Sequence, residues 1–373
     1  MNKDSLIKLM DPRLSQEELN EALIALENGR FLNGEQVERF EKNFAEFVGT
    51  KYAIAVNNGT SALIISLLAN GILPGDEIIT VSASFIATAN SIMSIGAKPY
   101  FVDINLSDYN IEIDEIRKAL DENGEKIKGI LPVHLYGRPS DAYKIKNICT
   151  EYGLKLVEDS CQAHGASLSL KRTGSFGDAS AFSFYPSKNM TVGGDGGMIT
   201  TNSEEINDIS KSIRNAGRAK GSAYEHERYG FTARMNTVNA AIGLAQLKEL
   251  PKWLEKRREN AKYLLSKLAD LNEVVLPPSD NDLIKSAWHQ FVIRTKKRSE
   301  LSRYLLKNGI ETGIHYPIPI HMQPFYINEI KLNVKHLPST ELWAKEVLSL
   351  PIHNKLDQKD LDHISLKIHD FFR

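Results

Sequence analysis

The sequence predicts an α/β protein with a largely parallel central sheet, followed by a smaller α+β region. Through the first two-thirds of the 373 residues, short β-rich runs alternate with helical patterns, which is typical of a parallel sheet with helices on both faces. After about residue 235 the pattern changes to long helical stretches and then to short strand–helix units. This length fits two domains, which we place at 1–245 and 246–373.

The expected strands of the first part are short, apolar and rich in β-branched or aromatic residues. They lie at 51–56, 76–81, 98–104, 128–137, 154–159, 179–185 and 196–201. The segments between them carry helical spacing, and the expected helices lie at 60–71, 85–96, 113–120 and 141–153.

The second part is expected to open with two long helical stretches, at 236–250 and 252–271, with a bend at Pro251 between them. A strand within 288–295 and a helix within 298–310 follow. A strand at 347–353 and a terminal helix within 357–372 complete the expected elements.

The composition excludes several classes of function. Lys and Arg number 46 against 47 Asp and Glu, so neither a nucleic-acid surface nor a polybasic membrane patch is expected. Two cysteines exclude a disulfide framework and fit a reducing compartment. The uncharged run 78–97 is interrupted by polar residues and fits a strand and a helix better than a membrane span. Because the first residues lack the apolar core of a signal peptide, we expect a cytoplasmic protein.

Three stretches lie just past expected strand ends, where open α/β sheets collect their ligands: 57–61, 159–164 and 185–197. In the first, Gly59 permits a tight turn, and Thr60 and Ser61 can cap a helix and face an anion. An ordinary capped helix is the commoner explanation for such a stretch taken alone. It matches neither a P-loop nor a dinucleotide fingerprint.

The second stretch places Glu158 and Asp159 at a strand end, followed by Gln162 and His164. Adjacent carboxylates in a strand point to opposite faces, which disfavours a glycosidase-type pair. Asp159 could bond local backbone in a turn, act as a general acid or base, or keep a heterocyclic nitrogen protonated.

The third stretch, FYPSKNMTVGGDGG, has Lys188 just past a strand end. A partly buried lysine has its charged form disfavoured, so its amine can act as a nucleophile. The glycines allow close backbone approach, and we interpret Asp195 only as a turn-forming residue. One lysine alone would be explained better as part of a flexible surface loop.

The combination is more informative than any single stretch. An anion cradle, a carboxylate and a lysine at strand ends of one sheet are what pyridoxal phosphate requires for its phosphate, its ring nitrogen and its aldehyde. Phe85 could stack on such a ring, although a core phenylalanine is the more frequent case. The segment 313–324, with His315, Tyr316 and His321, reads as a rigid loop lining a pocket rather than as a metal site. We expect no metal.

The sequence resembles, nearly end to end, the DegT/DnrJ/EryC1/StrS family of pyridoxal-phosphate-dependent sugar aminotransferases. The segments that carry the resemblance are 31–63, 75–104, 158–166, 181–199 and 315–324. The resemblance implies the aspartate-aminotransferase fold, pyridoxal 5′-phosphate with pyridoxamine 5′-phosphate as an intermediate form, and a homodimer with active sites at the subunit interface.

The resemblance also implies residue roles. Lys188 would form the Schiff base, Asp159 would pair with the ring nitrogen, Gln162 would contact the ring hydroxyl region and Phe85 would stack on the ring. Thr60, Ser61 and Ser183 match phosphate contacts, with Gly59 at the turn. In the segment that reaches the neighbouring subunit's phosphate, the family commonly has Asn where this chain has Thr232, while Arg234 is retained. His315, Tyr316 and His321 are candidates for sugar contacts.

The expected reaction is therefore ping-pong transfer of an amino group from an amino acid, expected to be glutamate, to a nucleotide-linked keto-sugar. The segments 184–197 and 313–324 are more similar to members acting on 3-keto than on 4-keto sugars. Two alternatives remain open. A sugar dehydratase of the same family would be expected to carry histidine in place of Lys188, and a non-catalytic regulatory or binding homologue would be expected to lose Lys188 or Asp159.

Overall fold

The computed structural model describes residues 6–32, 34–330 and 336–373. Within them, the central sheet has seven strands. In spatial order the strands are β1 (Tyr52–Val56), β9 (Gly197–Thr201), β8 (Ala179–Ser183), β5 (Lys155–Asp159), β4 (Ile127–Ile130), β2 (Glu77–Val81) and β3 (Lys98–Val102). Only β9 runs antiparallel to its neighbours; the pairs from β8 to β3 are all parallel. The predicted α/β architecture is confirmed.

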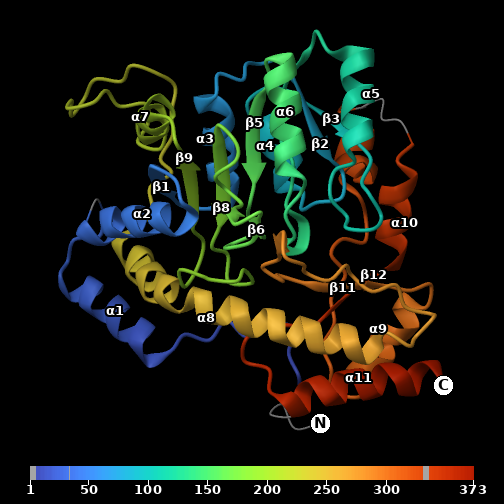
Figure 1. Cartoon of the computed structure of the whole chain (residues 1–373). Coiled ribbons are helices and arrows are strands. Elements are labelled where there is room, and N and C mark those ends of the chain that lie inside the picture. The colour runs from blue at the N-terminus through green and yellow to red at the C-terminus, as the bar shows by residue number, and fades with distance from the viewer. Residues whose placement is uncertain (1–5, 33, 331–335) are drawn as a thin grey trace.

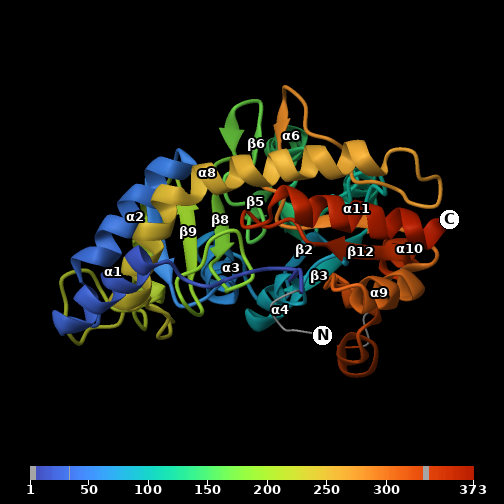
Figure 2. The ribbon, with the colours of Figure 1, turned by 90° about the horizontal axis from the view of Figure 1, so that it is seen from below.

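Helices cover both faces of this sheet. The helices of this part are α3 (Gly59–Ala69), α4 (Ala87–Ser94), α5 (Ile113–Asn123), α6 (Ala142–Tyr152) and α7 (Glu204–Ile213). Helix α6 lies on one face, and α3 and α4 lie on the other (Figure 1, Figure 2). The carboxyl ends of β5 and β8, which are parallel neighbours, therefore open onto the same edge.

The fourth strand is shorter than the predicted span 128–137. It ends at Ile130, and a 3₁₀ turn, η2 (Leu135–Gly137), follows. Pro132 has no N–H to donate to a ladder, and Tyr136 has a φ of 58°, which no strand residue adopts. The chain keeps hydrogen bonds to its neighbours as far as His134, with a single parallel bridge between Val133 and Asp159, and it leaves the sheet at the turn 135–137.

The remaining elements form a second group beside the sheet. These are α1 (Gln16–Glu27), α2 (Glu35–Val48), α8 (Thr237–Leu268), β11 (Phe291–Arg294), α9 (Arg298–Lys307), α10 (Pro338–Glu346), β12 (Val347–Leu350) and α11 (Gln358–Phe372). Strands β11 and β12 pair antiparallel. Small pieces complete the chain: β6 (Ser167–Leu168), β7 (Lys171–Arg172), β10 (Ile284–Lys285), η3 (Ile320–Met322) and η4 (Phe325–Ile330). No helix among the described residues has the length and apolar character needed to cross a membrane.

Helix α8 joins the two groups. The two expected helical stretches form one helix that continues through Pro251 (Figure 1). Leu250 and Leu254 pack in the cluster that contains Phe40 and Phe44 of α2, whereas residues near its end, such as Leu264, pack with α11. The boundary at 245/246 falls inside this helix, and we retain it as a proposal.

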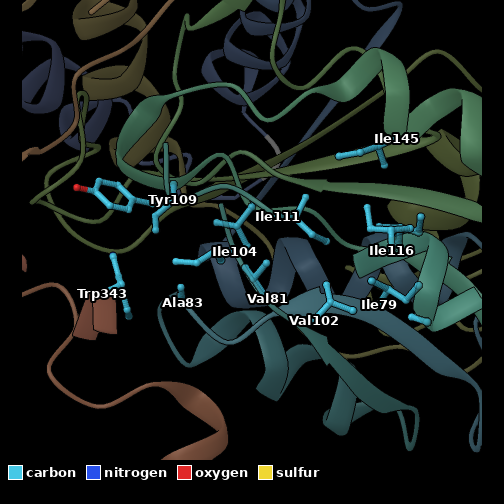
Figure 3. Close-up of a cluster of buried hydrophobic side chains, with 14 of the residues drawn as sticks. Ile79, Val81, Ala83, Val102, Ile104, Tyr109, Ile111, Ile116, Ile145 and Trp343 are labelled. Carbon is cyan, nitrogen blue, oxygen red and sulfur yellow. The ribbon is translucent and has the colours of Figure 1, made fainter. Parts of the chain in front are cut away.

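One hydrophobic cluster links the sheet to the C-terminal group. Figure 3 shows Ile79 and Val81 of β2 beside Val102 of β3, with Tyr109 and Trp343 at one end of the cluster. Each such buried side chain contributes roughly 1.5–3 kcal/mol. The indole N–H of Trp343 donates to the Tyr136 hydroxyl at 3.0 Å, and that hydroxyl donates to the His315 carbonyl. The cluster thereby fixes the loop that carries His315.

Candidate active site

A cavity of about 460 Å³ opens at the carboxyl ends of the parallel strands. Its walls come from the start of α3, the segment 84–88, the end of β5, the segment 183–188 and the segment 315–316. The structure brings nine of the predicted residues to this cavity: Gly59, Thr60, Phe85, Asp159, Gln162, Ser183, Lys188, His315 and Tyr316.

The start of α3 forms one wall of the cavity. Asn58 caps the helix, and its Oδ1 accepts from the N–H of Ser61 at 2.8 Å. A Cβ at Gly59 would lie 2.7 Å from the Cβ of Ser183, so only glycine lets the helix start lie this close to β8. Free N–H groups at a helix start favour an anion, and Thr60 and Ser183 border the same space.

The two carboxylates at the end of β5 point to opposite faces, as predicted. Asp159 faces the cavity, where its Oδ2 accepts from the Thr88 hydroxyl at 2.8 Å and its Oδ1 accepts from the Cys161 N–H at 3.2 Å. The Thr88 hydroxyl also contacts the Ser84 hydroxyl at 2.8 Å. This chain of hydrogen bonds fixes the carboxylate in one orientation.

Glu158 is fully buried on the other face and has a structural role. Its carboxylate accepts from the N–H groups of Gly174, Phe176 and Gly177 and lies 2.9 Å from His134 Nε2. Burial acts to raise the pKa of Glu158, but the hydrogen bonds from His134 and the backbone outweigh it and leave this pKa below its usual range.

Glu158→Gln is expected to lower the free energy of unfolding by about 3–5 kcal/mol, because buried N–H groups lose their charged acceptor. The depressed folded pKa means that this contribution is present above about pH 4.3, the ordinary glutamate value, and is lost as the pH falls toward the folded pKa. Urea unfolding at pH 7 and pH 3 measures both effects. Glu151→Gln, on the exposed surface, is the control, and equal stability of the two variants would contradict this role.

Lys188 enters the cavity from a turn in which its own N–H donates to the Tyr185 carbonyl at 2.8 Å. Among the described residues, no hydrogen bond or ion pair engages its Nζ. Burial lowers the pKa of Lys188, and the nearby Cys161 and Asp159 oppose part of that shift. An unpaired amine with a depressed pKa is suited to nucleophilic and proton-transfer chemistry.

Aromatic rings form part of the cavity wall. The Phe85 side chain is 53% exposed, so it is a cavity wall and not the core residue that is the more frequent case. Its ring centroid lies 5.9 Å from that of Tyr316.

Two polar residues of the cavity, Gln162 and His315, are held in defined states. Gln162 Oε1 accepts from the Tyr136 N–H at 2.9 Å. Burial and the Lys188 charge lower the pKa of His315 to about 4, so His315 is neutral near pH 7.

Four predicted residues lie outside this cavity. The N–H of Ser61 is used by the Asn58 cap, and His321 Nδ1 lies 2.6 Å from the Ser82 hydroxyl. Thr232 pairs with Asn215 through the backbone, and Arg234 donates to Asn215 Oδ1 at 3.0 Å. Within the described part of the chain, no three His, Cys, Asp or Glu residues are placed to hold a metal ion.

Sequence reasoning assigned no role to several residues that line the cavity: Asn58, Leu63, Ser84, Ala87, Thr88, Cys161, Tyr185 and Ser187. Asn58, Cys161, Tyr185 and Ser187 lie inside the three strand-end stretches, and the other four lie within a few positions of predicted residues. Asp195, interpreted only as a turn residue, also lines the cavity.

A lysine, a hydrogen-bonded carboxylate and a helix start converge at the strand ends of this fold, and comparison with known proteins places the chain among the aminotransferases. The chain belongs to the DegT/DnrJ/EryC1/StrS aminotransferase family, whose model matches residues 12–369.

Individual relatives cover most of the chain. A dTDP-3-amino-3,4,6-trideoxy-alpha-D-glucose transaminase of Streptomyces venezuelae is 36% identical, covering 94% of this chain and 92% of its own. A pleiotropic regulatory protein of Geobacillus stearothermophilus is 37% identical, covering 93% and 92%. Among solved structures, NtdA of Bacillus subtilis with bound cofactor PMP superimposes with a TM-score of 0.90 at 31% identity, covering 98% of this chain and 85% of NtdA.

Proposed function

We propose that this protein is a pyridoxal-phosphate-dependent sugar aminotransferase that moves an amino group from glutamate to a nucleotide-linked keto-sugar, with a 3-keto sugar as the preferred acceptor. The observation that carries the proposal is the convergence of Lys188, Asp159 and the start of α3 in one cavity. The relatives named for nucleotide-sugar transamination support the acceptor class.

The cavity residues fit the cofactor. Asp159 is oriented by two hydrogen bonds, the Lys188 amine is unengaged, and the close approach at Gly59 sets the helix start against Ser183. When bound, pyridoxal phosphate supplies an electron sink that makes the α-proton of an amino acid removable.

The chain's own residues divide the remaining tasks. Lys188 Nζ would hold the cofactor through its aldehyde and, when free, would move the proton from the donor α-carbon. Asp159 would keep the proton on the ring nitrogen, and Thr60 and Ser183, which border the cavity, would hold the phosphate. Phe85 would stack on the ring and Gln162 would orient it, while His315 and Tyr316 would contact the sugar. Ser61 and His321 lie outside the cavity, and no contact within it is assigned to them. The depressed pKa of Lys188 keeps more of its amine in the neutral, reactive form.

The purified protein tests this function by its spectrum. It is expected to be yellow from an imine band, and glutamate should convert that band to the pyridoxamine form, after which a panel of nucleotide-linked 3-keto and 4-keto sugars should restore it selectively. A colourless protein that ignores added pyridoxal phosphate would overturn the proposal. A yellow protein unaffected by every amino donor would favour the dehydratase or the regulatory homologue.

We also propose that the protein is a cytoplasmic homodimer in which Thr232 and Arg234 reach the partner's phosphate site. Both residues lie away from the cavity of their own chain, as a contribution to a neighbouring site requires.

Co-expression of Lys188→Ala with Arg234→Ala is expected to restore activity to roughly a quarter of the wild-type level, although each variant alone is impaired. Half of randomly mixed dimers are heterodimers, and one of the two sites in each heterodimer has both residues intact. Activity of the unfractionated mixture measures this, and heterodimers isolated through two different tags are expected to show roughly half of the wild-type activity. Absence of recovery would place Arg234 in its own subunit's site.

A further inference from the structure

A second cavity, of about 600 Å³, shares Ser187 and Lys188 with the first. Its other walls come from the N-terminal segment 10–18, from α8 and from the segment 353–355. Apart from Lys188, no residue that the sequence analysis singled out lines this cavity. A cavity of this size next to a reactive amine is large enough for a small ligand.

Arg257 of α8 is the most buried cation that lines this second cavity, and it is only 6% exposed. Its Nη1 donates to the Trp288 carbonyl at 2.9 Å, and its Nε has no hydrogen-bond partner. No carboxylate among the described residues forms an ion pair with it. Burial lowers the pKa of Arg257 to about 10, so the group remains charged near pH 7. A buried charge without a counter-charge is costly, and an anionic ligand would remove that cost.

Four acidic residues line the same cavity, and none of them forms an ion pair with Arg257. Asp11 pairs with Arg13 and with Lys355, and Glu17 lies 3.8 Å from Lys248 Nζ. Glu18 is buried and accepts from the Ser15 N–H in the cap of α1, and Glu249 lies on the exposed side of α8. Arg257 is therefore left without a carboxylate partner among the described residues.

Two buried acceptors lie in the same cavity. Asn189 Nδ2 donates to the Ala287 carbonyl at 2.7 Å, which leaves its Oδ1 without a partner. His353 Nε2 lies 3.1 Å from the Lys8 carbonyl, which leaves its Nδ1 without a partner. Asn189 and His353 are 5% and 7% exposed. A cationic donor with two free acceptors is complementary to a ligand that carries both a carboxylate and an ammonium group.

We propose that this second cavity is a binding subsite for the amino-acid donor, in which Arg257 binds a carboxylate and Asn189 and His353 accept from the amino group beside Lys188. This inference rests on the proposed transaminase function. It adds a residue on α8 to the site, far in sequence from the motifs at the strand ends.

The test uses holoenzyme and 2-methylglutamate, which has the charged groups of glutamate but no α-hydrogen to lose. Arg257→Gln is expected to weaken its binding about 10- to 100-fold in calorimetric titration, because a charge-assisted hydrogen-bonded pair is lost. Arg258→Gln is the matched control. Its side chain follows directly on α8, donates to the Ser286 carbonyl and to Glu255, and does not line the cavity. This control is expected to bind within about twofold of the wild type.

Wild-type affinity in Arg257→Gln would overturn the inference. If that variant does not fold, Arg257→Lys, which keeps the charge but not the planar fork, is expected to bind at intermediate strength, and unchanged affinity there would equally overturn it. Failure of the proposed function is distinguishable, because it would remove the imine band of the wild type or its response to glutamate. Failure of this inference alone leaves both intact.

Discussion

Lys188→Ala is expected to abolish the imine absorbance band and to lower the transamination rate by roughly 10⁴-fold or more, because one side chain supplies both the covalent attachment and the proton transfer. The structure places no second amine among the described residues lining the first cavity. The absorbance spectrum of the purified variant and single-turnover kinetics with glutamate measure the two losses separately.

Two control variants sharpen this prediction. Lys188→Arg keeps a positive charge but is expected to lose the band as well, which separates imine formation from simple electrostatics. Lys171→Ala removes another partly buried lysine, whose Nζ lies 4.7 Å from the centre of the Phe176 ring and whose pKa burial also lowers. That variant is expected to retain band and rate. A normal spectrum in Lys188→Ala would refute the assignment of the nucleophile.

Asp159→Asn is expected to cost about 2–5 kcal/mol of transition-state stabilisation, the range for losing one partner of a buried charged pair, which corresponds to roughly 30- to 5,000-fold in rate. The asparagine keeps the shape and can still accept from the Thr88 hydroxyl, so the loss comes from the charge that holds the ring nitrogen protonated. Steady-state kinetics and cofactor titration of the purified variant provide the measurement.

Thr88→Val offers a graded comparison, because it removes one donor to the Asp159 carboxylate without removing the charge, and its effect should be roughly tenfold or less. Asp178→Asn changes a carboxylate that accepts from the Leu156 N–H away from the cavity and should leave the rate unchanged. A rate for Asp159→Asn equal to that of Asp178→Asn would exclude Asp159 from the site.

Much of the site could be predicted from the sequence because it follows strand ends. The carboxyl ends of parallel strands meet at one edge, and Asp159 and Lys188 follow β5 and β8, which are parallel neighbours. The opposite orientations of Glu158 and Asp159 likewise follow from strand geometry alone. Local rules of this kind need no knowledge of distant contacts.

The places of other predicted residues and the end of one strand depended on contacts between segments far apart in the sequence, which no local pattern contains. His321 lies against Ser82, 239 residues away, and not in the cavity with His315. The regular strand expected at 128–137 ends at Ile130, and after a single bridge at Val133 the chain turns at 135–137, where Tyr136 has a positive φ.

The sequence by itself determined the alternation of strands and helices between residues 51 and 201, the family and the three strand-end stretches, because these depend on spacing and on residue type. It did not place helices α1, α2, α7 and α10. Only the tertiary structure decided that Phe85 forms a cavity wall and that Arg257, one cation within a charged helical stretch, is buried without a counter-charge. The physical reason is that burial depends on what packs against a helix from elsewhere in the chain. For Arg257, that neighbour includes Trp288, whose carbonyl accepts from Arg257 Nη1. The residues next to Arg257 in the sequence give no sign of this contact.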